Sequence, residues 1–586
     1  MDLFDYVTDS TNSAYSDVLA EVEKVLNGNS AVVNKPTRVG FTHSSMVLAE
    51  GKHQNMLLVA PTNKIGEEAT KEQAKDSIKI YGHSACHKIR EKLDKDPFMK
   101  NLPLHLPKDC PCSKYPDCDY RRSWTESTWV RTVTTDKLIS MAMSETEESI
   151  SNKEQLGNLH WVIFDESHLL CLDKPVVVDC DYKRVTVPRL RRRARPTKNS
   201  MFWEFKKLEY IYQQYCSLLG EMYETGIFDQ IRNNVAEIGD DQYHAVEWPN
   251  SFVISSECMI AGFGDLIRLA DNRNELGMPD EDILQLSKVC SLMSNASVRI
   301  SFLRTGDGDK INISGSEGIT KASLKTFVAK VCPNAKVFFV SGTQFNHNDT
   351  YEFIANRQLE NVIVPDVKRT NSKMSIYPDK WQVNSINFWE RDAKGNQVTV
   401  LRIANRIKEI YDENAGHPLL VFLMARKYAN AVTYQLKQMC PELLEHAHGK
   451  EPQIRISYYR SVFSTGVKSD ARVCVVIGCA ELPKNVNDMV TRNYIDSQCL
   501  RVQSVDAATW QAWSRVKDPN GEVASKIYCI GIKKEKVLRV ITWGSNRTVT
   551  FGDNGKINVS VDEELPRPNI AIVKEKRWQC NEFSVK

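Results

Sequence analysis

The sequence predicts an α/β protein in which parallel sheets carry the functional groups. Over the first two hundred residues, short apolar runs such as "SAVV", "MLLVAPT" and "HWVIFDE" alternate with helix-like segments, the pattern of a parallel sheet covered by helices. The alternation returns further along with "KVFFVSGTQF", "PLLVFLMA" and "RVCVVIGC". A chain of 586 residues exceeds what one hydrophobic core normally supports, so several domains are expected.

Composition limits the broad class of the protein. The net charge of +3, with 42% hydrophobic and 26% charged residues, is ordinary for globular proteins, so any nucleic-acid-binding surface must be local. The longest apolar run, Pro418 to Ala425, is too short to cross a bilayer, and no secretory leader is visible. We therefore expect a soluble, intracellular, cytoplasmic protein without membrane contact, with the nucleus left open. The 16 scattered cysteines fit a reducing compartment.

A helical pattern separates the two strand-rich regions. Between residues 201 and 295, apolar residues recur at three- and four-residue spacing, as in an amphipathic helix. The residues that carry this spacing are Phe205, Leu208, Tyr212, Tyr215 and Leu219. This segment is predicted to be a helical insertion. Beyond Val537 the polar and apolar residues alternate around a Gly-Asp-Asn-Gly turn, which predicts a small hairpin.

The segment "KPTRVGFT" lies between a predicted strand and a predicted helix and has the outline of a phosphate-binding loop. A glycine such as Gly40 lets the backbone approach phosphate oxygens, and a hydroxyl such as Thr42 can hold Mg²⁺. The alternative is an ordinary turn before a helix.

Phe41 stands where a phosphate-binding loop carries its lysine. That lysine normally reaches the β- and γ-phosphates, so its loss should weaken triphosphate binding and transition-state stabilisation. Lys35 and Arg38 are nearby cations, but both precede the glycine turn. Sequence alone leaves open whether either side chain points inward.

The run "LHWVIFDESHLL" is an apolar strand that ends in two carboxylates, Asp165 and Glu166, followed by Ser167 and His168. Adjacent acids at a strand end can divide the work of phosphoryl transfer: one holds Mg²⁺ and its neighbour polarises the attacking water. The alternative is an acidic turn in which Ser167 caps a helix.

Four cysteines fall between these two loops in a polar, turn-rich segment: Cys86, Cys110, Cys112 and Cys118. Four thiolates within about thirty residues can hold an iron–sulfur cluster or zinc, whereas unrelated free thiols usually lie in apolar runs. The spacing favours a metal site without choosing the metal. His83 and His87 could complete a zinc shell instead.

Basic residues are concentrated between Asp181 and Lys198: Lys183, Arg184, Arg189, Arg191, Arg192, Arg193, Arg195 and Lys198. Such a cluster can contact nucleic-acid phosphates without reading sequence. A solvated linker or a nuclear import signal has the same composition.

The segment "DAATWQAWSRVKDPNGE" predicts a helix that presents Gln511 and Arg515 and ends near Asp518. An arginine on such a helix can reach a nucleotide held by another domain and stabilise the charge on its γ-phosphate. The alternative is a surface helix with a salt bridge.

Taken in order, these segments resemble the superfamily 2 DNA helicases of the XPD/DinG type, over roughly Ser30 to Ile532. "KPTRVGFT" is similar to motif I, "LLVAPTNKIGEEA" to motif Ia and "DESH" to the family's Asp-Glu-Ala-His. "VSGTQF" is similar to motif III, "PLLVFLMARKYA" to motif IV, "STGVKSDARVCVVIGCAELPKN" to motif V and "QAWSRVKDPNG" to motif VI.

The resemblance implies two RecA-like helicase domains, the first interrupted by an iron–sulfur insertion and a helical arch insertion. The implied limits are 1–80, 126–180 and 300–370 for the first RecA-like domain, 81–125 for the iron–sulfur domain, 181–299 for the arch with its basic linker, and 371–586 for the second RecA-like domain with a C-terminal β-rich appendage. It also favours a [4Fe–4S] cluster over zinc.

The resemblance further implies roles for individual residues. Asp165 would hold Mg²⁺, Glu166 would activate water, and His168 would couple nucleotide state to the other motifs. Arg515 would be the arginine finger, with Gln511 beside it. The phosphate loop would use Thr37, Gly40 and Thr42.

The chain departs from the family pattern in three places. Motif I has Phe41 for lysine and Arg38 for its first glycine. Motif VI has Ser514 for glycine and Asp518 for its second arginine, with Lys517 one place early. The Cys-Pro-Cys pair is tighter than the family's two-residue gap.

Two functions follow. The first is an ATP- and Mg²⁺-dependent helicase or translocase that moves 5′ to 3′ on single-stranded or forked DNA, with RNA left open. The second is a nucleic-acid-binding relative with little or no ATPase, because Phe41 replaces the motif I lysine.

Overall fold

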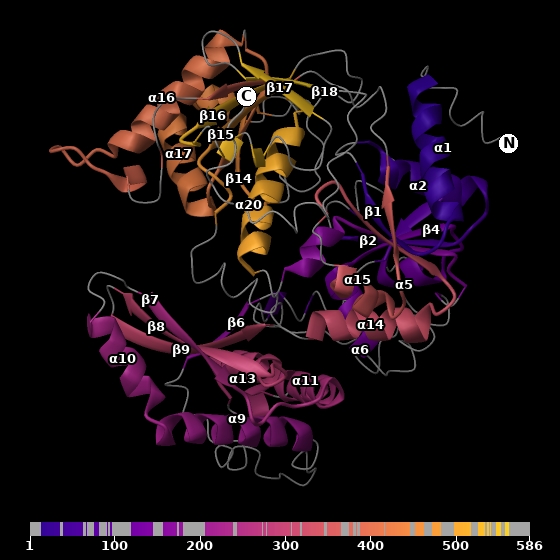
Figure 1. The fold of residues 1–586 in the computed structure, drawn as a ribbon, viewed down its shortest axis with the longest axis vertical. Helices are drawn as coiled ribbons and strands as arrows, with labels where there is room; N and C mark the ends of the chain where they lie inside the picture. The colour runs from indigo at the N-terminus through magenta and orange to yellow at the C-terminus, as the bar shows by residue number, and fades with distance from the viewer. Residues whose placement is uncertain are drawn as a thin grey trace.

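The computed structural model of the chain contains two largely parallel sheets and one antiparallel sheet, each packed against helices (Figure 1). These elements come from the part of the chain that the structure describes. The described residues are 13–35, 39–62, 66, 76–80, 91, 94–95, 119–143, 156, 158–172, 175–179, 205–237, 243–271, 273–276, 278–305, 308–316, 319–344, 348–364, 374–378, 383, 387–414, 416–445, 452–461, 471–481, 497–516, 525–533, 536–537, 539–540, 547–551 and 557–561.

The first sheet consists of seven parallel strands in the order β11, β1, β10, β5, β2, β4, β3. Their bounds are β1 (Ala31–Asn34), β2 (Met56–Ala60), β3 (Ser77–Lys79), β4 (Val130–Thr134), β5 (Trp161–Asp165), β10 (Lys336–Ser341) and β11 (Glu360–Ile363). Strand β2 is buried along its whole length, as expected for a strand covered on both faces.

Alternate residues of these strands enter two separate apolar clusters. In β5, Trp161 and Ile163 join one cluster and Val162 and Phe164 the other, as the two-residue period of a strand requires. The first cluster is completed by α1 (Ser13–Asn27) and α2 (Phe41–Gly51). The second is completed by α5 (Asp119–Thr125), α6 (Thr135–Met143), α14 (Ile319–Val331) and α15 (Asn348–Ala355).

The second sheet has the order β14, β13, β15, β16, β12, β18, β17. Its parallel strands are β12 (Met374–Pro378), β13 (Leu419–Leu423), β14 (Ile454–Tyr458), β15 (Val473–Ile477) and β16 (Ser525–Ile530). The antiparallel pair β17 (Arg547–Phe551) and β18 (Ile557–Val561) extends the sheet beside β12. This pair confirms the predicted hairpin near the C-terminus.

Helices cover both faces of the second sheet. One face packs on α16 (Val398–Glu413), α17 (Arg426–Met439) and the short turns η8 (Asn387–Trp389) and η9 (Pro441–Leu443). The other face packs on α20 (Ser497–Ser514), through residues such as Trp510 and Trp513. The cluster that contains these tryptophans also contains Val162 and Phe164 on one face of the first sheet. Apolar contacts are therefore continuous between the two sheets.

The inserted unit is an antiparallel sheet packed on helices. Its strands, in spatial order, are β6 (Pro175–Asp179), β9 (Gly308–Ser316), β8 (Ser297–Thr305) and β7 (Tyr243–Pro249). Its helices are α9 (Lys206–Glu224), α10 (Ile227–Glu237), α11 (Ser256–Asp271), α12 (Arg273–Leu276) and α13 (Asp280–Leu292). The amphipathic helix predicted over this segment is confirmed, since the five apolar residues that define it are all buried.

The sequence predicts this insertion as helical, and the structure adds the sheet. Strands β6 and β9 fall within the segments 126–180 and 300–370, which the resemblance assigns to the first RecA-like domain. In the structure they pair with each other, with Pro175 opposite Ser316. This pairing joins residues far apart in the sequence, so local periodicity carries no sign of it. Among the described helices, none combines the length and apolar character that a membrane-spanning segment needs.

Candidate active site

The candidate site lies where three neighbouring strands of the first sheet end. Strands β1, β10 and β5 are parallel and adjacent, with Asn34 opposite Ser341 and Val340 opposite Asp165. Their carboxyl ends therefore meet at one edge, the usual location of function in such sheets. The backbone amide of Lys35 donates to the Ser341 carbonyl at 3.1 Å and extends the pairing by one residue.

The predicted phosphate loop leads into α2 at this edge. Gly40 precedes the helix with φ 86° and ψ 16°, a left-handed conformation that favours glycine. Thr42 lies in the first turn, and its hydroxyl donates to Oδ2 of Asp165 at 3.2 Å. The loop glycine and hydroxyl are thus brought to the first carboxylate, whereas Thr37 lies outside the described residues.

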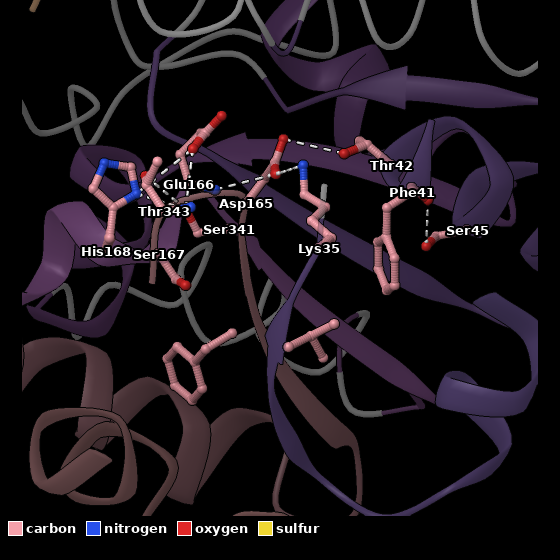
Figure 2. A network of polar contacts seen from close by, with 12 residues as sticks. Lys35, Phe41, Thr42, Ser45, Asp165, Glu166, Ser167, His168, Ser341 and Thr343 are labelled. Atoms are coloured by element: carbon pink, nitrogen blue, oxygen red, sulfur yellow. Dashed lines mark hydrogen bonds and ion pairs between the residues drawn. The ribbon is translucent and has the colours of Figure 1, made fainter. Parts of the chain in front are cut away.

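Asp165 is nearly buried between the loop and the ammonium group of Lys35. The Lys35 Nζ lies 3.8 Å from Asp165 Oδ1, and each of these side chains is only 10% exposed. Burial raises the pKa of the Asp165 carboxyl, and the positive charge of Lys35 opposes this effect. Figure 2 shows that the Lys35 and Thr42 polar groups both approach this carboxylate.

Phe41 does not contribute to this polar group. Its side chain is 1% exposed and packs in the apolar cluster that includes Val33, Ile163 and Phe338. Figure 2 shows the ring directed away from Asp165. The first residue of α2 is therefore a core residue, and among the residues that the structure describes, the cation paired with Asp165 is Lys35, directly after β1.

Glu166 is held by residues from both sheets. It has φ 49° and ψ 41°, a conformation that costs a non-glycine residue about 1 kcal/mol or more. Its Oε2 accepts hydrogen bonds from Gln511 Nε2 at 2.8 Å and from Ser341 Oγ at 3.3 Å. Arg515 Nη2 lies 3.9 Å from Oε1.

Gln511 and Arg515 reach Glu166 from α20, at the last turn and directly after it. Residues four apart lie on the same face of a helix, which explains how both arrive at one carboxylate. Gln511 is 2% exposed. The surface-helix alternative is therefore wrong, because this end of α20 is packed against the first sheet.

His168 completes the polar group as a neutral imidazole. Its Nδ1 lies 2.8 Å from Ser341 Oγ, and its Nε2 lies 3.4 Å from Gln511 Nε2. Burial, and next the charge of Arg460, lower its pKa to about 3. Because the amide nitrogen of Gln511 can only donate, the imidazole accepts at Nε2 and donates from Nδ1 to Ser341, which leaves the Ser341 hydroxyl to donate to Glu166.

Three residues of the segment similar to motif III, "VSGTQF", also belong to this site, although no role was predicted for them. Ser341 is the last residue of β10 and Thr343 lies two residues beyond it, with Thr343 Oγ1 3.2 Å from Gln511 Nε2. Gln344 holds the turn that follows β5, since its Nε2 donates to Ser167 Oγ at 2.8 Å. The resemblance to motif III pointed to this segment, and the pairing of β10 with β5 brings it to the site.

Arg460 was also missed, and no local pattern marks it. It follows β14 with φ 63°, and its Nη2 donates to Ser504 Oγ at 2.9 Å and to the Ala480 carbonyl at 3.3 Å. Burial lowers the pKa of this guanidinium to about 10. Its charge acts on His168, so the second sheet contributes a further cation beside the site.

The remaining predicted residues lie outside the described part of the chain. These are the four cysteines, with His83 and His87, and the basic stretch from Asp181 to Lys198. Among the described residues, no group of three or more His, Cys, Asp or Glu side chains is arranged to hold a metal ion. The iron–sulfur or zinc site therefore remains a prediction.

Comparison with known proteins gives matches among solved structures. No protein-family model matches the chain, and no curated protein sequence matches it. An XPD helicase aligns over 91% of this chain and 97% of its own, with a TM-score of 0.46 and 14% identity. The S. tokodaii protein Xpd4 aligns over 90% of this chain and 99% of its own, with a TM-score of 0.43 and 12% identity.

The helicase Lhr of Mycobacterium smegmatis, solved with single-stranded DNA and AMP-PNP, is also similar. It aligns over 92% of this chain and 48% of its own, with a TM-score of 0.40 and 11% identity. Two of these three structures, the XPD helicase and Lhr, are called helicases in their names.

Proposed function

We propose that the chain is an ATP-dependent helicase or translocase that acts on DNA, and that ATP is hydrolysed between its two parallel sheets. One observation carries the proposal: Gln511 and Arg515 reach Glu166 from α20, next to the Thr42–Asp165 pair at the start of α2. Donors from one sheet unit thus converge on a carboxylate of the other. A nucleotide bound there would couple the positions of the two units.

The start of α2 suits a phosphate. The first amides of a helix have no acceptor within the helix, and the helix dipole favours negative charge at this end. Gly40 leaves open space at its α-carbon, since a β-carbon built there would meet nothing within 4 Å. These features support binding of the triphosphate at the loop.

Thr42 and Asp165 fit a magnesium ion, because both offer oxygen atoms and one of them is a carboxylate. Bound there, magnesium would neutralise phosphate charge and orient the phosphates. The protein residues would supply the remaining functions. Glu166 would accept the proton of the attacking water, while Gln511 and Ser341 hold its carboxylate in position.

Arg515 would stabilise the negative charge that develops on the transferred phosphoryl group, as an arginine finger does. Its partner Glu166 is only 12% exposed, so water screens this charge little. Neutral His168 would join Ser341 and Gln511, the two donors to Glu166, without adding charge. Movement in the 5′ to 3′ direction is proposed from the resemblance to XPD/DinG helicases.

A second candidate function is nucleic-acid binding with little or no ATP hydrolysis. The burial of Phe41 favours it, because the usual loop lysine is replaced by a core residue. The two candidates differ in turnover and share the fold.

Hydrolysis of ATP stimulated by single-stranded DNA distinguishes the two candidates. The purified protein is compared with Glu166→Gln, which keeps the shape of the side chain and removes its basicity. We expect the wild type to hydrolyse ATP at least about a hundredfold faster than the variant. Equal rates in the two proteins, with DNA binding retained, would favour the second candidate.

We also propose a [4Fe–4S] cluster on Cys86, Cys110, Cys112 and Cys118, with zinc as the alternative. A cluster of this kind gives a brown protein with absorbance near ~400 nm. Replacing Cys110 and Cys112 by serine should abolish this absorbance. A colourless protein that contains zinc would overturn the assignment.

Single-stranded or forked DNA is the proposed partner, with RNA left open. The basic stretch from Asp181 to Lys198 supports this, because dense positive charge binds phosphates by releasing counterions. Replacing Arg191, Arg192 and Arg193 by alanine should weaken DNA binding and reduce the slope of log affinity against log salt by about 3. An unchanged slope would show that the stretch is a linker.

A further inference from the structure

The site has a cation close to its first carboxylate, but the cation comes from an unusual place. In the expected loop, the lysine directly precedes the hydroxyl residue of the helix, and here that position is Phe41. Because Phe41 is uncharged and its ring is buried in the core, this position supplies no positive charge to the loop. Any compensating charge has to come from another residue.

Lys35 is positioned to provide that charge. Its backbone is fixed by the hydrogen bond from its amide to the Ser341 carbonyl, at the end of β1. Its side chain is 10% exposed, and Nζ lies 3.8 Å from Asp165 Oδ1. The same carboxylate accepts the Thr42 hydrogen bond at its other oxygen, so ammonium and hydroxyl lie on either side of one carboxylate.

A lysine with so little exposure needs an anion beside it. The 3.8 Å separation from Asp165 is an ion-pair distance and exceeds that of a direct hydrogen bond. If Asp165 binds magnesium, as proposed above, its negative charge is balanced by the metal ion. The Lys35 ammonium group then requires another anion. The triphosphate is the anion that the proposed function brings to this edge of the sheet.

We propose that Lys35 replaces the missing loop lysine and supplies the positive charge to the phosphates of bound ATP. This inference rests on the proposed function and assigns the cation of that same site. The lysine of the phosphate-binding loop has thus moved from the first turn of the helix to the end of the preceding strand. Its four-carbon stem approaches the carboxylate from β1 (Figure 2).

The first test uses the wild-type protein and a desthiobiotin acyl phosphate of ATP. A lysine amine near the phosphates attacks the acyl carbon, an amide bond forms, the carbon–oxygen bond to ATP breaks, and the amine proton goes to solvent. Mass spectrometry of the digested protein should find the label on Lys35, and excess ATP should remove it. Labelling that ATP competes away from a different lysine would overturn the inference.

The second test uses variants. Lys35→Met removes the charge at similar length, and Lys35→Arg keeps it. Lys336→Met is the matched control, since Lys336 lies at the opposite end of the same sheet and donates to the Leu26 and Asn27 carbonyls. Two quantities are measured for each variant: the binding of a fluorescent AMP-PNP analogue in the presence of magnesium, and the rate of DNA-stimulated ATP hydrolysis.

Lys35→Met should weaken analogue binding by at least about tenfold and slow hydrolysis by about a hundredfold or more. Lys35→Arg should recover part of both, and Lys336→Met should stay within about twofold of wild type. Normal binding and hydrolysis by Lys35→Met would overturn the inference and leave the proposed function intact. A wild type that neither binds the analogue nor takes the label would overturn both.

Discussion

The side-chain amide of Gln511 donates a 2.8 Å hydrogen bond to the Glu166 carboxylate, although the two residues lie 345 positions apart. Gln511 lies in the last turn of a helix packed on the second sheet, and Glu166 follows a central strand of the first. This bond is therefore a direct polar link between the two units, at the residue proposed to activate water. A change in the distance between the units would therefore change the hydrogen bonding of this carboxylate.

Gln511→Ala removes the amide and leaves Ser341 as the nearest donor to Glu166 Oε2. A hydrogen bond to a charged group contributes about 1.5–3 kcal/mol, so we expect hydrolysis to fall by about ten- to a hundredfold. Binding of AMP-PNP should stay within a few fold, since Gln511 is not placed at the phosphate loop. Gln438→Ala, on the exposed face of α17, is the control. Unchanged turnover in Gln511→Ala would show that this bond does not position the base.

Arg515→Ala tests the proposed arginine finger. Such arginines contribute about 10³-fold or more to turnover, so kcat should fall by about that factor while nucleotide binding changes little. The control is Arg406→Ala, because Arg406 pairs with Glu409 and Glu413 on the surface of α16 and lies outside the site. If kcat is retained and only the KM for ATP rises, Arg515 binds the nucleotide in its ground state and does not stabilise the transition state.

The strands that build the site were predictable from sequence, and the contacts across the site were only partly so. The apolar run ending in Asp165 and Glu166 predicts a buried strand with acids at its carboxyl end, and β5 has this form. The order of the motif-like segments along the chain predicted that Gln511 and Arg515 belong to the same site as Asp165 and Glu166. Periodicity and turn chemistry are local properties, and these elements are specified locally.

The residues that sequence did not resolve depend on neighbours distant in the chain. Lys35 points inward because β1 lies beside β10, a pairing of residues about 300 positions apart. Arg460 acts at the site through the packing of one sheet unit on the other. The inserted sheet was missed for the same reason, although the sequence Thr-Gly-Asp-Gly at the junction of β8 and β9 is a usable hairpin signal.

Phe41 is expected to behave as a core residue. Phe41→Ala should lower the free energy of unfolding of the first sheet unit by about 3–5 kcal/mol, because it leaves a cavity in the apolar cluster, and Phe41→Leu should cost less. Phe41→Lys places a charge in the same cluster and should lower the melting temperature without raising hydrolysis. Melting curves and ATPase rates of the three variants check this. A stable Phe41→Lys protein with faster hydrolysis would identify Phe41 as a lesion in the loop.

His168 gives the protein a predictable pH dependence. Its pKa in the folded protein is about 3, against about 6.5 in an unfolded chain, so the unfolded state takes up the proton first as the pH falls. Stability is therefore unaffected by this group above about pH 6.5 and decreases as the pH falls from 6.5 toward 3. Between pH 6.5 and 5.0 the loss from this group is about 2 kcal/mol.

His168→Gln removes the titration and keeps a side chain that can hydrogen bond. Urea unfolding of wild type and variant, followed by tryptophan fluorescence at pH 7.5 and pH 5.0, measures the difference. Wild type should lose about 2 kcal/mol more than His168→Gln between these pH values, whereas the exposed-site control His417→Gln should lose as much as wild type. An equal loss in wild type and His168→Gln would mean that the imidazole gains its proton in the folded protein. The Ser341–His168–Gln511 arrangement would then carry a charge next to Glu166, and the neutral link proposed for it would be wrong.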